Sequence, residues 1–558
     1  MVFGVFSALA AICPLPAASC CGPILDVARY AFKLSRSNLL AGSRHLAASS
    51  NDIFGFNGLN LAVSSVLPIF ALTFKRSPLM LEWMFLAGRV ATVVLNLLYL
   101  CLVVGTIVVV ISGNRNPVKT IAWVLVLVFL PVVGLVLYFF IGQDQRRIRI
   151  INKKLYGRLM KKSRMQFIEQ GQPPIPQEHA RLISLFRDLC QAYPFDGNDI
   201  TVYTRGSTML QALLREMQQA HDHIHLESYI IEDDAIGRMI RDVLIERASR
   251  GVRVRLLYDD VGCWHVPQSF FERMKECGIE VYSFLKVRMP LFASRMNYRN
   301  HRKVIVVDGR VGFIGGMNLA ERYVRGLPWG NWRDTHLRIQ GRAVYALQTT
   351  FLLDWYLMDR TLLTKSRYFP RIEPQGTSLT QIVVSEPVGE WRGIMQGVCL
   401  ALAQAQRYFY IQTPYFLPTE AVLVAMQTAA LAGVDVRLMI PMRTDNRLTH
   451  IGSRSYLADV LRAGVKVYLY KKGFLHSKMM VADDVLCTVG STNVDFRSFE
   501  HNFEANAFIY DAEVALQMRE IFALDQRDSV QVFLKNWMKR PWWKKALESV
   551  VRMLAPLL

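Results

Sequence analysis

The sequence predicts an α/β protein made of two similar halves that share one site, preceded by a two-helix transmembrane hairpin. Three observations support this prediction. Strand-like and helix-like patterns alternate in two consecutive stretches of the chain, as they do in α/β sandwiches. Each stretch contains one copy of the same His-x-Lys-x(4)-Asp pattern. Two long apolar runs that lack any charged residue come before both stretches.

The hairpin prediction concerns residues 83–145, with spans near 90–111 and 121–141. Each run meets the roughly 20 residues that a bilayer requires, and Pro131 in the second run is tolerable in a membrane helix. A pair of buried core helices is the alternative. Nine basic residues follow between 146 and 164. Because positive residues stay on the cytoplasmic side, we expect everything C-terminal to be cytoplasmic.

The composition agrees with a membrane-associated protein. The chain has 558 residues, 52% of them hydrophobic, and 66 Lys and Arg against 45 Asp and Glu, a net charge of +21. Such an excess attracts nucleic acid or an anionic lipid surface, and charge alone does not choose between them. The nine cysteines show no metal-binding spacing, so we interpret them as reduced thiols of a cytosolic region.

Two segments have less informative sequences. Residues 1–82 form an N-terminal extension of unclear structure, whose apolar start lacks the basic residues of a signal peptide. Residues 146–180 form a basic segment and a linker that contains Pro173, Pro174 and Pro176.

An internal repeat defines the two halves, residues 181–365 and 366–535. Gly251-Val-Arg-Val-Arg-Leu mirrors Gly433-Val-Asp-Val-Arg-Leu, and the order of expected strands and helices matches element for element. We expect largely parallel sheets from this alternation.

Each half contains one motif, at 301–308 and at 476–483. The motif residues are His301, Lys303 and Asp308 in the first half, and His476, Lys478 and Asp483 in the second. Residues two apart on a strand face the same way, so each motif presents an imidazole and an ammonium on one surface. The aspartates lie where a hairpin turn is expected. Small residues and an asparagine follow, Asn318 in one half and Asn493 in the other.

This set of groups suits phosphodiester chemistry. One imidazole can attack phosphorus while the other protonates the leaving oxygen. Two lysines and two asparagines can neutralise the phosphate oxygens, so the chemistry requires no metal and no cofactor. A single motif could be an ordinary half-buried strand with a lysine at its rim, but two matching copies in matching repeats argue against that interpretation.

Each histidine needs an acceptor that orients its other ring nitrogen. Asp334 and Glu504 follow the motifs on strand-like segments that should return beside the histidine; solvated strand carboxylates are the alternative. The alternating His221, His223 and His225 do not complete a metal site. Glu227 either lines the site or has a structural role.

These residues resemble the phospholipase D superfamily over about 183–511 and, within it, the bacterial cardiolipin synthases. The narrower likeness rests on the hairpin, on Asn116-Pro117 leading into Ala122-Trp123, and on Ile224-His-Leu-Glu227. The resemblance implies an enzyme of the bacterial inner membrane that moves a phosphatidyl group from one phosphatidylglycerol to another through a histidine, releasing glycerol. It favours His301 as the nucleophile and His476 as the general acid and then base, with the reverse order open. Asp308 and Asp483 would brace the motifs.

Residues 536–558 predict an amphipathic interfacial helix with tryptophans and basic residues at its start; a helix packed on the domain's own core is the alternative. Other functions remain open: a nuclease, a hydrolase of the phospholipase D type, a transferase that uses another alcohol, or a non-catalytic scaffold. Phosphatidylethanolamine remains an alternative donor, and the oligomeric state is not predicted.

Overall fold

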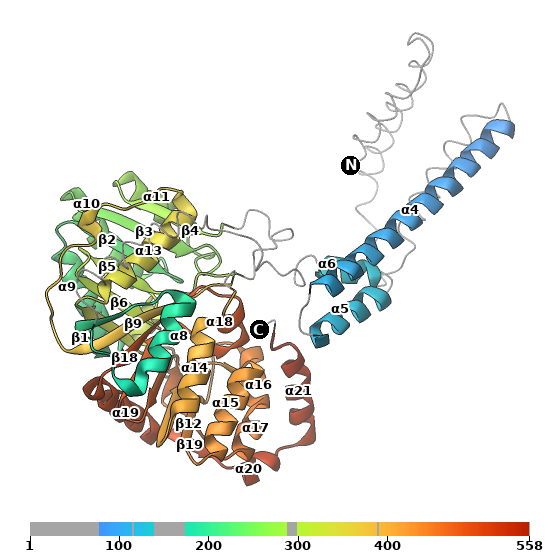
Figure 1. Ribbon diagram of the computed structural model, residues 1–558. Coiled ribbons are helices and arrows are strands. Elements are labelled where there is room, and N and C mark those ends of the chain that lie inside the picture. The colour runs from blue at the N-terminus through green and yellow to red at the C-terminus, as the bar shows by residue number, and fades with distance from the viewer. Residues whose placement is uncertain (1–77, 114–116, 139–172, 287–297, 388–389, 557–558) are drawn as a thin grey trace. The chain divides into compact units, whose positions relative to one another are not determined.

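The computed structural model describes residues 78–113, 117–138, 173–286, 298–387 and 390–556 (Figure 1). The chain divides into two compact units, residues 1–105 and 106–558. Expectations for residues 1–77, and for the basic segment up to residue 172, lie outside the described residues.

The first apolar run lies in one long helix, α4 (Pro78–Ser112), which is the one helix among the described residues that is long and apolar enough to cross a membrane. The second run forms two shorter helices, α5 (Pro117–Phe129) and α6 (Pro131–Leu137). Leu130 between them has φ −131° and ψ 62°, because a residue before proline avoids the helical region. Among the described residues, the run near 121–138 therefore forms no single helix long enough to cross a membrane, and the predicted two-helix hairpin is not confirmed. Tyr138 packs with Val110 and Leu127.

One 15-stranded sheet runs through both halves, in the order β19-β13-β12-β10-β15-β16-β18-β9-β1-β8-β6-β5-β2-β3-β4. The strands of the first half are β1 (Pro194–Tyr203), β2 (His223–Ser228), β3 (Arg253–Asp259), β4 (Glu280–Phe284), β5 (Val304–Val307), β6 (Val311–Gly315) and β8 (His336–Gln340). Those of the second are β9 (Ser378–Ser385), β10 (Tyr408–Gln412), β12 (Asp435–Pro441), β13 (Lys466–Tyr470), β15 (Met479–Ala482), β16 (Leu486–Gly490), β18 (Glu504–Tyr510) and β19 (Ser529–Val532).

The strand order repeats outward from the antiparallel pair β1 and β9, which confirms the two repeated halves. Parallel pairing occurs between β2, β3 and β4, and between β10, β12 and β13. The inner pairs are antiparallel, so the prediction of largely parallel sheets was wrong. The reason is that each half inserts a motif hairpin, β5–β6 or β15–β16, beside its parallel strands.

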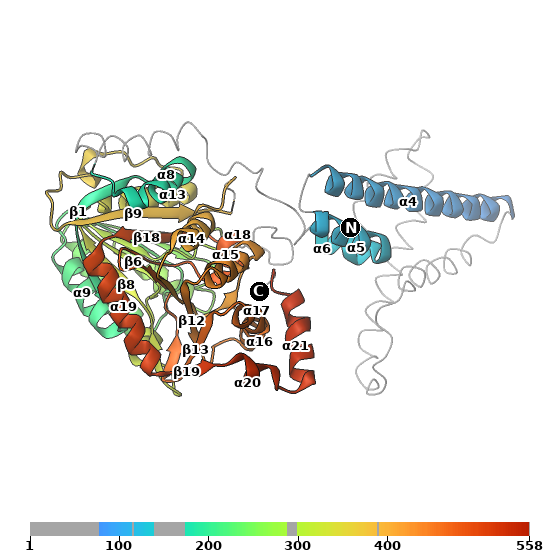
Figure 2. The ribbon, with the colours of Figure 1, turned by 60° about the horizontal axis from the view of Figure 1, so that its bottom comes forward.

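Helices cover both faces of the sheet (Figures 1 and 2). The longer ones are α8 (Ala180–Cys190), α9 (Gly206–Gln218), α10 (Ala235–Ser249), α11 (Gln268–Glu276), α13 (Val344–Asp359), α14 (Gly393–Gln404), α15 (Glu420–Leu431), α16 (Arg447–Ser455), α19 (Ala512–Arg527) and α21 (Trp542–Met553). Shorter helices are α12 (Glu321–Arg325), α17 (Leu457–Arg462), α18 (Phe496–Glu500) and α20 (Leu534–Met538). On one face, α13 and α19 share a single core with strands of both halves.

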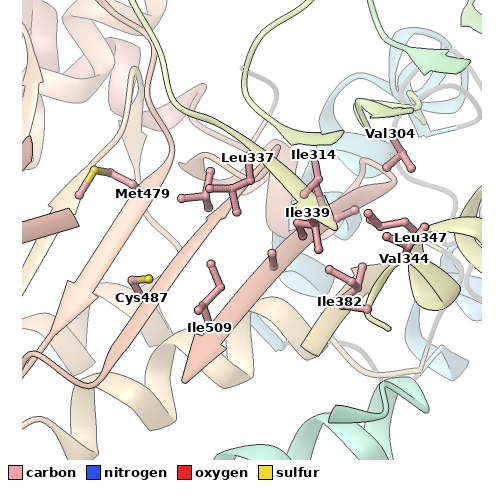
Figure 3. Close-up of a cluster of buried hydrophobic side chains, with 14 of the residues drawn as sticks. Val304, Ile314, Leu337, Ile339, Val344, Leu347, Ile382, Met479, Cys487 and Ile509 are labelled. Atoms are coloured by element: carbon pink, nitrogen blue, oxygen red, sulfur yellow. The ribbon is translucent and has the colours of Figure 1, made fainter. Parts of the chain in front are cut away.

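Figure 3 shows part of this shared core, with Val304 and Leu337 from the first half and Met479 and Ile509 from the second. On the opposite face each half has its own core. Helix α8, which lies in the stretch assigned to the first half, packs into the core of the second. The halves are therefore joined by buried apolar surface, which holds the site between them in fixed geometry.

Candidate active site

Two matching contacts tie each motif to the opposite half. The short strands β7 (Asn331–Arg333) and β14 (Gly473–Leu475) pair in parallel just before Asp334 and His476. In the other direction, Asn300 bridges Phe503 just before His301 and Glu504. The backbone N–H of His301 donates to the Phe503 carbonyl at 3.0 Å, and that of His476 to the Arg333 carbonyl at 2.7 Å. The two motifs thus meet in one place.

Each histidine is held by an acid of the opposite half. The Nδ1 atom of His301 lies 3.0 and 3.1 Å from the two carboxylate oxygens of Glu504. The Nδ1 atom of His476 lies 2.7 Å from Oδ2 of Asp334. Both acids are buried. Each therefore lies beside the histidine of the other half and not beside the one that it follows in the sequence. The hydrogen bond on Nδ1 leaves Nε2 of His301 for chemistry. Nε2 of His476 lies 3.1 Å from Lys478 Nζ.

The motif lysines lie beside their histidines. Residues 301–303 and 476–478 precede strands β5 and β15 and do not belong to them, so the expectation that both side chains project from a strand was wrong. Lys303 Nζ donates to the His301 carbonyl at 2.6 Å, and Lys478 Nζ donates to the His476 carbonyl at 2.6 Å. Both lysines are buried.

Burial controls the protonation of these groups. It lowers the pKa of His301 to about 4, although Glu504 acts in the opposite direction. Burial, assisted by Lys478, lowers the pKa of His476 to about 3 against the pull of Asp334. Both imidazoles are therefore neutral at pH 7 in the free site, and a neutral imidazole is the nucleophilic form.

The lysines and acids are shifted as well. Burial lowers the pKa of Lys303 to about 7 and that of Lys478 to about 8. Burial alone would raise the pKa of Glu504, but His301 and Lys303 together lower it to about 2. Burial is likewise outweighed at Asp334, whose pKa is lowered by Lys478 and His476. The free site thus pairs two carboxylates with two ammonium groups that lose their protons near neutral pH.

The two acids are fixed in different ways. Glu504 accepts hydrogen bonds from Ser491 Oγ and, at 3.1 Å, from Asn502 Nδ2. Asp334 accepts from its neighbour's backbone N–H at 2.7 Å. It lies so close to Gly316 that a Cβ there would come within 2.1 Å of Oδ1. The position after the first motif glycine is therefore Gly316 in one half, where Asp334 leaves no room for a side chain. In the other half it is Ser491, whose hydroxyl donates to Glu504.

Asp308 and Asp483 lie at the motif hairpins, away from the histidines. Asp308 accepts three backbone N–H groups at 2.8 to 2.9 Å, from residues 221–223. Asp483 accepts three at 2.7 to 2.8 Å, from residues 406–408. Asp308 has φ +52° and Asp483 φ +54°, which confirms the predicted tight turns. Each carboxylate ties its hairpin to the start of the neighbouring strand.

The two asparagines are buried. Asn318 accepts from the Ile230 backbone N–H at 3.1 Å and donates to the Tyr323 hydroxyl. Asn493 donates to Asp495 at 3.0 Å. The ring of Tyr323 lies 5.9 Å from that of His476, so Asn318 of the first half reaches the histidine of the second through one side chain.

Sequence reasoning missed a buried polar layer beneath His301. Arg302 is 1% exposed and donates to Asp354 at 2.5 Å and to the Glu504 carbonyl at 3.2 Å. Asn300 donates to Glu227 and accepts from the Arg302 backbone N–H at 3.1 Å. Burial and Asp354 together raise the pKa of Glu227 well above its usual range. The sequence feature that could have indicated this layer is Arg302, between His301 and Lys303, where the second motif has Ser477.

Aromatic rings line both histidines. Tyr229 lies edge-on to His301 at 5.0 Å, and Lys303 Nζ lies 5.4 Å from the centre of the same ring. Phe474 and Trp332 lie 5.5 and 5.2 Å from His476. These aromatic walls lower the local dielectric constant, which strengthens the electrostatic interactions of the site.

The alternating histidines of β2 belong to the core. His223 and His225 contact opposite ends of the Gln348 amide, at 2.9 and 2.7 Å. Within the described parts of the chain, no group of three or more His, Cys, Asp or Glu is arranged to hold a metal ion.

Comparison with known proteins identifies the family. The model of the family "Cardiolipin synthase, PLD-like domain" matches residues 213–351 and 398–526, and "Phospholipase_D-nuclease N-terminal" matches residues 101–143. A cardiolipin synthase of Geobacillus sp. is 38% identical over 83% of this chain and 94% of its own length. The major cardiolipin synthase of Bacillus subtilis is 37% identical over 84% of this chain and 100% of its own.

A solved structure supports the fold. The phosphatidylserine synthase of Haemophilus influenzae superposes with a TM-score of 0.51 at 14% identity, over 68% of this chain and 98% of that protein. Together with the sequence relatives, this shows that the chain belongs to the cardiolipin synthase family of phospholipase D-like proteins.

Proposed function

We propose that the protein is a cardiolipin synthase, which transfers a phosphatidyl group from one phosphatidylglycerol to another and releases glycerol. The observation that supports this best is the pair of histidines in one buried site, each hydrogen-bonded to an acid of the opposite half. It occurs in a chain whose family relatives are cardiolipin synthases.

In the first step, Nε2 of His301 attacks the phosphorus of phosphatidylglycerol. A nitrogen–phosphorus bond forms and the bond from phosphorus to the glycerol oxygen breaks. His476 gives its proton to that oxygen, and glycerol leaves. The attacking ring becomes cationic, and the carboxylate of Glu504, 3.0 Å from Nδ1, stabilises that charge.

In the second step, neutral His476 takes the proton of a headgroup hydroxyl on a second phosphatidylglycerol. The freed oxygen attacks phosphorus, the bond to His301 breaks, and cardiolipin forms. His476 is again protonated and Asp334, 2.7 Å away, holds it in place. The near symmetry of the two histidines leaves the reverse assignment as the alternative.

The phosphate charge adjusts the protonation of the site. In the free site, burial keeps both imidazoles neutral and lowers the pKa of both lysines. A phosphodiester anion among these groups favours their protonated forms, because opposite charges attract strongly in a buried site. Substrate binding thus charges His476 for its role as acid. Lys303 and Lys478 neutralise the phosphate oxygens, with Asn318 and Asn493 as further donors.

The apolar helices attach the protein to the bacterial inner membrane. We take α4 as one span and α5 with α6 as a second span broken at Pro131. A broken helix is tolerated where neighbouring protein satisfies its backbone, and Leu127 and Tyr138 pack with Val110. The nine basic residues at 146–164 favour a cytoplasmic catalytic region.

Helix α21 is proposed as an interfacial contact of the catalytic region. One side packs on the protein, where Val551 and Ala555 are buried and Arg540 pairs with Glu548 at 2.6 Å. The other side exposes apolar residues, among them Trp543, Leu547, Val550 and Met553. We therefore propose that the buried side anchors α21 on the catalytic region while the exposed apolar side faces the bilayer.

Mass-spectrometric lipid analysis of the purified protein with phosphatidylglycerol vesicles tests the proposal. Cardiolipin and free glycerol in equal amounts are expected. Phosphatidic acid in place of cardiolipin would mean that water is the acceptor. If cardiolipin forms only when phosphatidylethanolamine is added, the donor assignment is wrong.

A further inference from the structure

Three exposed tryptophans lie on loops that contact the surroundings of the site. Trp264 is 53% exposed, Trp329 36% and Trp391 52%. They lie on separate loops, after β3, before β7 and before α14 respectively. Several large aromatic side chains left in water near one site indicate a surface that contacts something apolar.

The loop of Trp264 rests on the wall of His301. The Sγ atom of Cys263 accepts from the Ile231 backbone N–H at 3.3 Å. A Cβ on Gly262 would come within 2.1 Å of the Tyr229 carbonyl, so the loop lies directly against Tyr229. The ring of Tyr229 in turn contacts His301.

The other two tryptophans approach from the second half's side of the site. Trp329 lies 6.4 Å from Phe474, whose ring contacts His476. The neighbour of Trp391, Arg392, donates to Glu500 at 3.3 Å in α18. Two residues after Glu500, Asn502 donates a hydrogen bond to Glu504, the acid that orients His301. Each tryptophan is thus a few contacts from a motif histidine.

Positive charge accompanies these residues. Arg443 and Arg447 are exposed in the loop after β12 and at the start of α16. Leu448 beside them is 47% exposed. In the same loop, Asp445 accepts from the Tyr415 hydroxyl at 2.7 Å, and Tyr415 contacts Phe474. Exposed tryptophans together with exposed arginines are typical of surfaces that enter the headgroup layer of an anionic bilayer.

A bilayer is the occupant that the chemistry favours. The histidines are buried, so a phospholipid must bring its phosphate from the headgroup layer into the protein while its acyl chains stay out of water. The same chain carries a helix able to cross a membrane. A site whose mouth touches the bilayer avoids the cost of exposing two acyl chains.

We propose that Trp264, Trp329 and Trp391 form a rim that inserts into the headgroup layer of an anionic bilayer and places the mouth of the site against it. This inference rests on the proposed function. It adds how the substrate arrives, laterally from the membrane and not through water.

The test compares full-length protein in nanodiscs on two substrates. One is long-chain phosphatidylglycerol in the disc. The other is a short-chain phosphatidylglycerol, added below its micelle-forming concentration to discs of phosphatidylcholine. The variants replace all three tryptophans by Ser or all three by Tyr. The control is the double variant Val424→Ser, Leu431→Ser, because both residues are exposed on α15. Leu431 lies just before the first residue of β12, at the end of that strand away from the site.

The Ser variant should lose about tenfold or more of its rate on long-chain lipid, given the apolar area withdrawn from the bilayer. It should stay within about twofold of wild type on the short-chain substrate, where no bilayer transfer is needed. The Tyr variant and the α15 control should keep both rates. Equal loss on both substrates, or loss on neither, would overturn the rim.

A second readout does not depend on activity. Lipids brominated near the headgroup should quench a larger share of tryptophan emission in wild type than in the Tyr variant. An unchanged quenched share would contradict the proposed membrane contact of the three tryptophans. A change of oligomeric state in the Ser variant would also contradict it, because the surface would then bind a second copy of the chain. Wild-type protein that makes no cardiolipin from either substrate would instead refute the proposed function, and the quenching result would still decide the rim.

Discussion

Replacing Glu504 by Gln should slow the first chemical step although the residue belongs to the opposite half from His301. The perturbation removes one charge and keeps the shape of the side chain. At the observed 3.0 Å from Nδ1, a carboxylate and a cationic ring attract by about 5 kcal/mol at an effective dielectric constant of about 20. The amide recovers part of this energy. We expect a loss of about 10²- to 10³-fold in the rate of glycerol release.

The assay is a rapid-quench measurement of glycerol released in the first turnover, with the lipid products analysed from the same samples. Ser491→Ala is the matched control. It removes one hydrogen bond to Glu504 but keeps the charge, and should cost about fivefold, the equivalent of about 1 kcal/mol. A Glu504→Gln rate within fivefold of wild type, or an equal loss in both variants, would refute the crossed pairing as a source of catalysis.

Three further predictions follow from the site. The value of kcat/KM should rise with pH through about 4, as His301 loses its proton, and fall through about 7, as Lys303 loses its own; a flat profile from pH 5 to 9 would contradict this. Asp308→Ala removes the acceptor of three backbone N–H groups and should destabilise the fold by about 3 kcal/mol. The thermal unfolding midpoint should fall, while kcat at low temperature should change less than about threefold. A large loss of kcat without loss of stability would mean that Asp308 touches substrate. Glu227→Gln should keep most activity, because Gln412 occupies the matching position of the second half, where it donates to Asp525 at 2.8 Å. Glu227→Ala should lower the rate about tenfold, because it releases Asn300, the residue before His301. Equal rates in the two variants would exclude this positioning role.

Much of the fold was predictable because it is periodic. Strand and helix patterns recur in register in both halves, and the two motifs mark the hairpins that the structure shows. The sheet direction was not predictable in this way. A short apolar strand such as Val304–Val307 can pair in parallel or antiparallel with its neighbours. Its antiparallel pairing with β2 and β6 depends on the arrangement of the whole sheet.

Other errors came from interactions between distant residues. Nothing local to Asp334 says that it reaches His476, 142 residues away, because the parallel pairing of β7 with β14 decides it. Helix α8 shows the same dependence, since its buried face fits the core of the second half. The break at Pro131 was a local effect that the hydropathy pattern concealed, because the residues on both sides of it are apolar.

The sequence marks the buried layer beneath His301 only by Arg302 at the middle position of the first motif. Arg302, Glu227 and Asp354 are all charged types that usually stay on the surface. Their burial becomes understandable only when the arginine, the acids and Asn300 are seen to satisfy one another.

The most direct test of the shared site uses a phosphatidyl ester of p-nitrophenol, a leaving group that needs no proton, on His301→Ala and His476→Ala variants. We expect the His476→Ala variant to release about one equivalent of nitrophenol per chain and then stall, with the phosphatidyl group on the peptide that contains His301. The His301→Ala variant should release none. A phosphatidyl group on the His476 peptide of the His301→Ala variant, or continued turnover by either variant, would contradict the account.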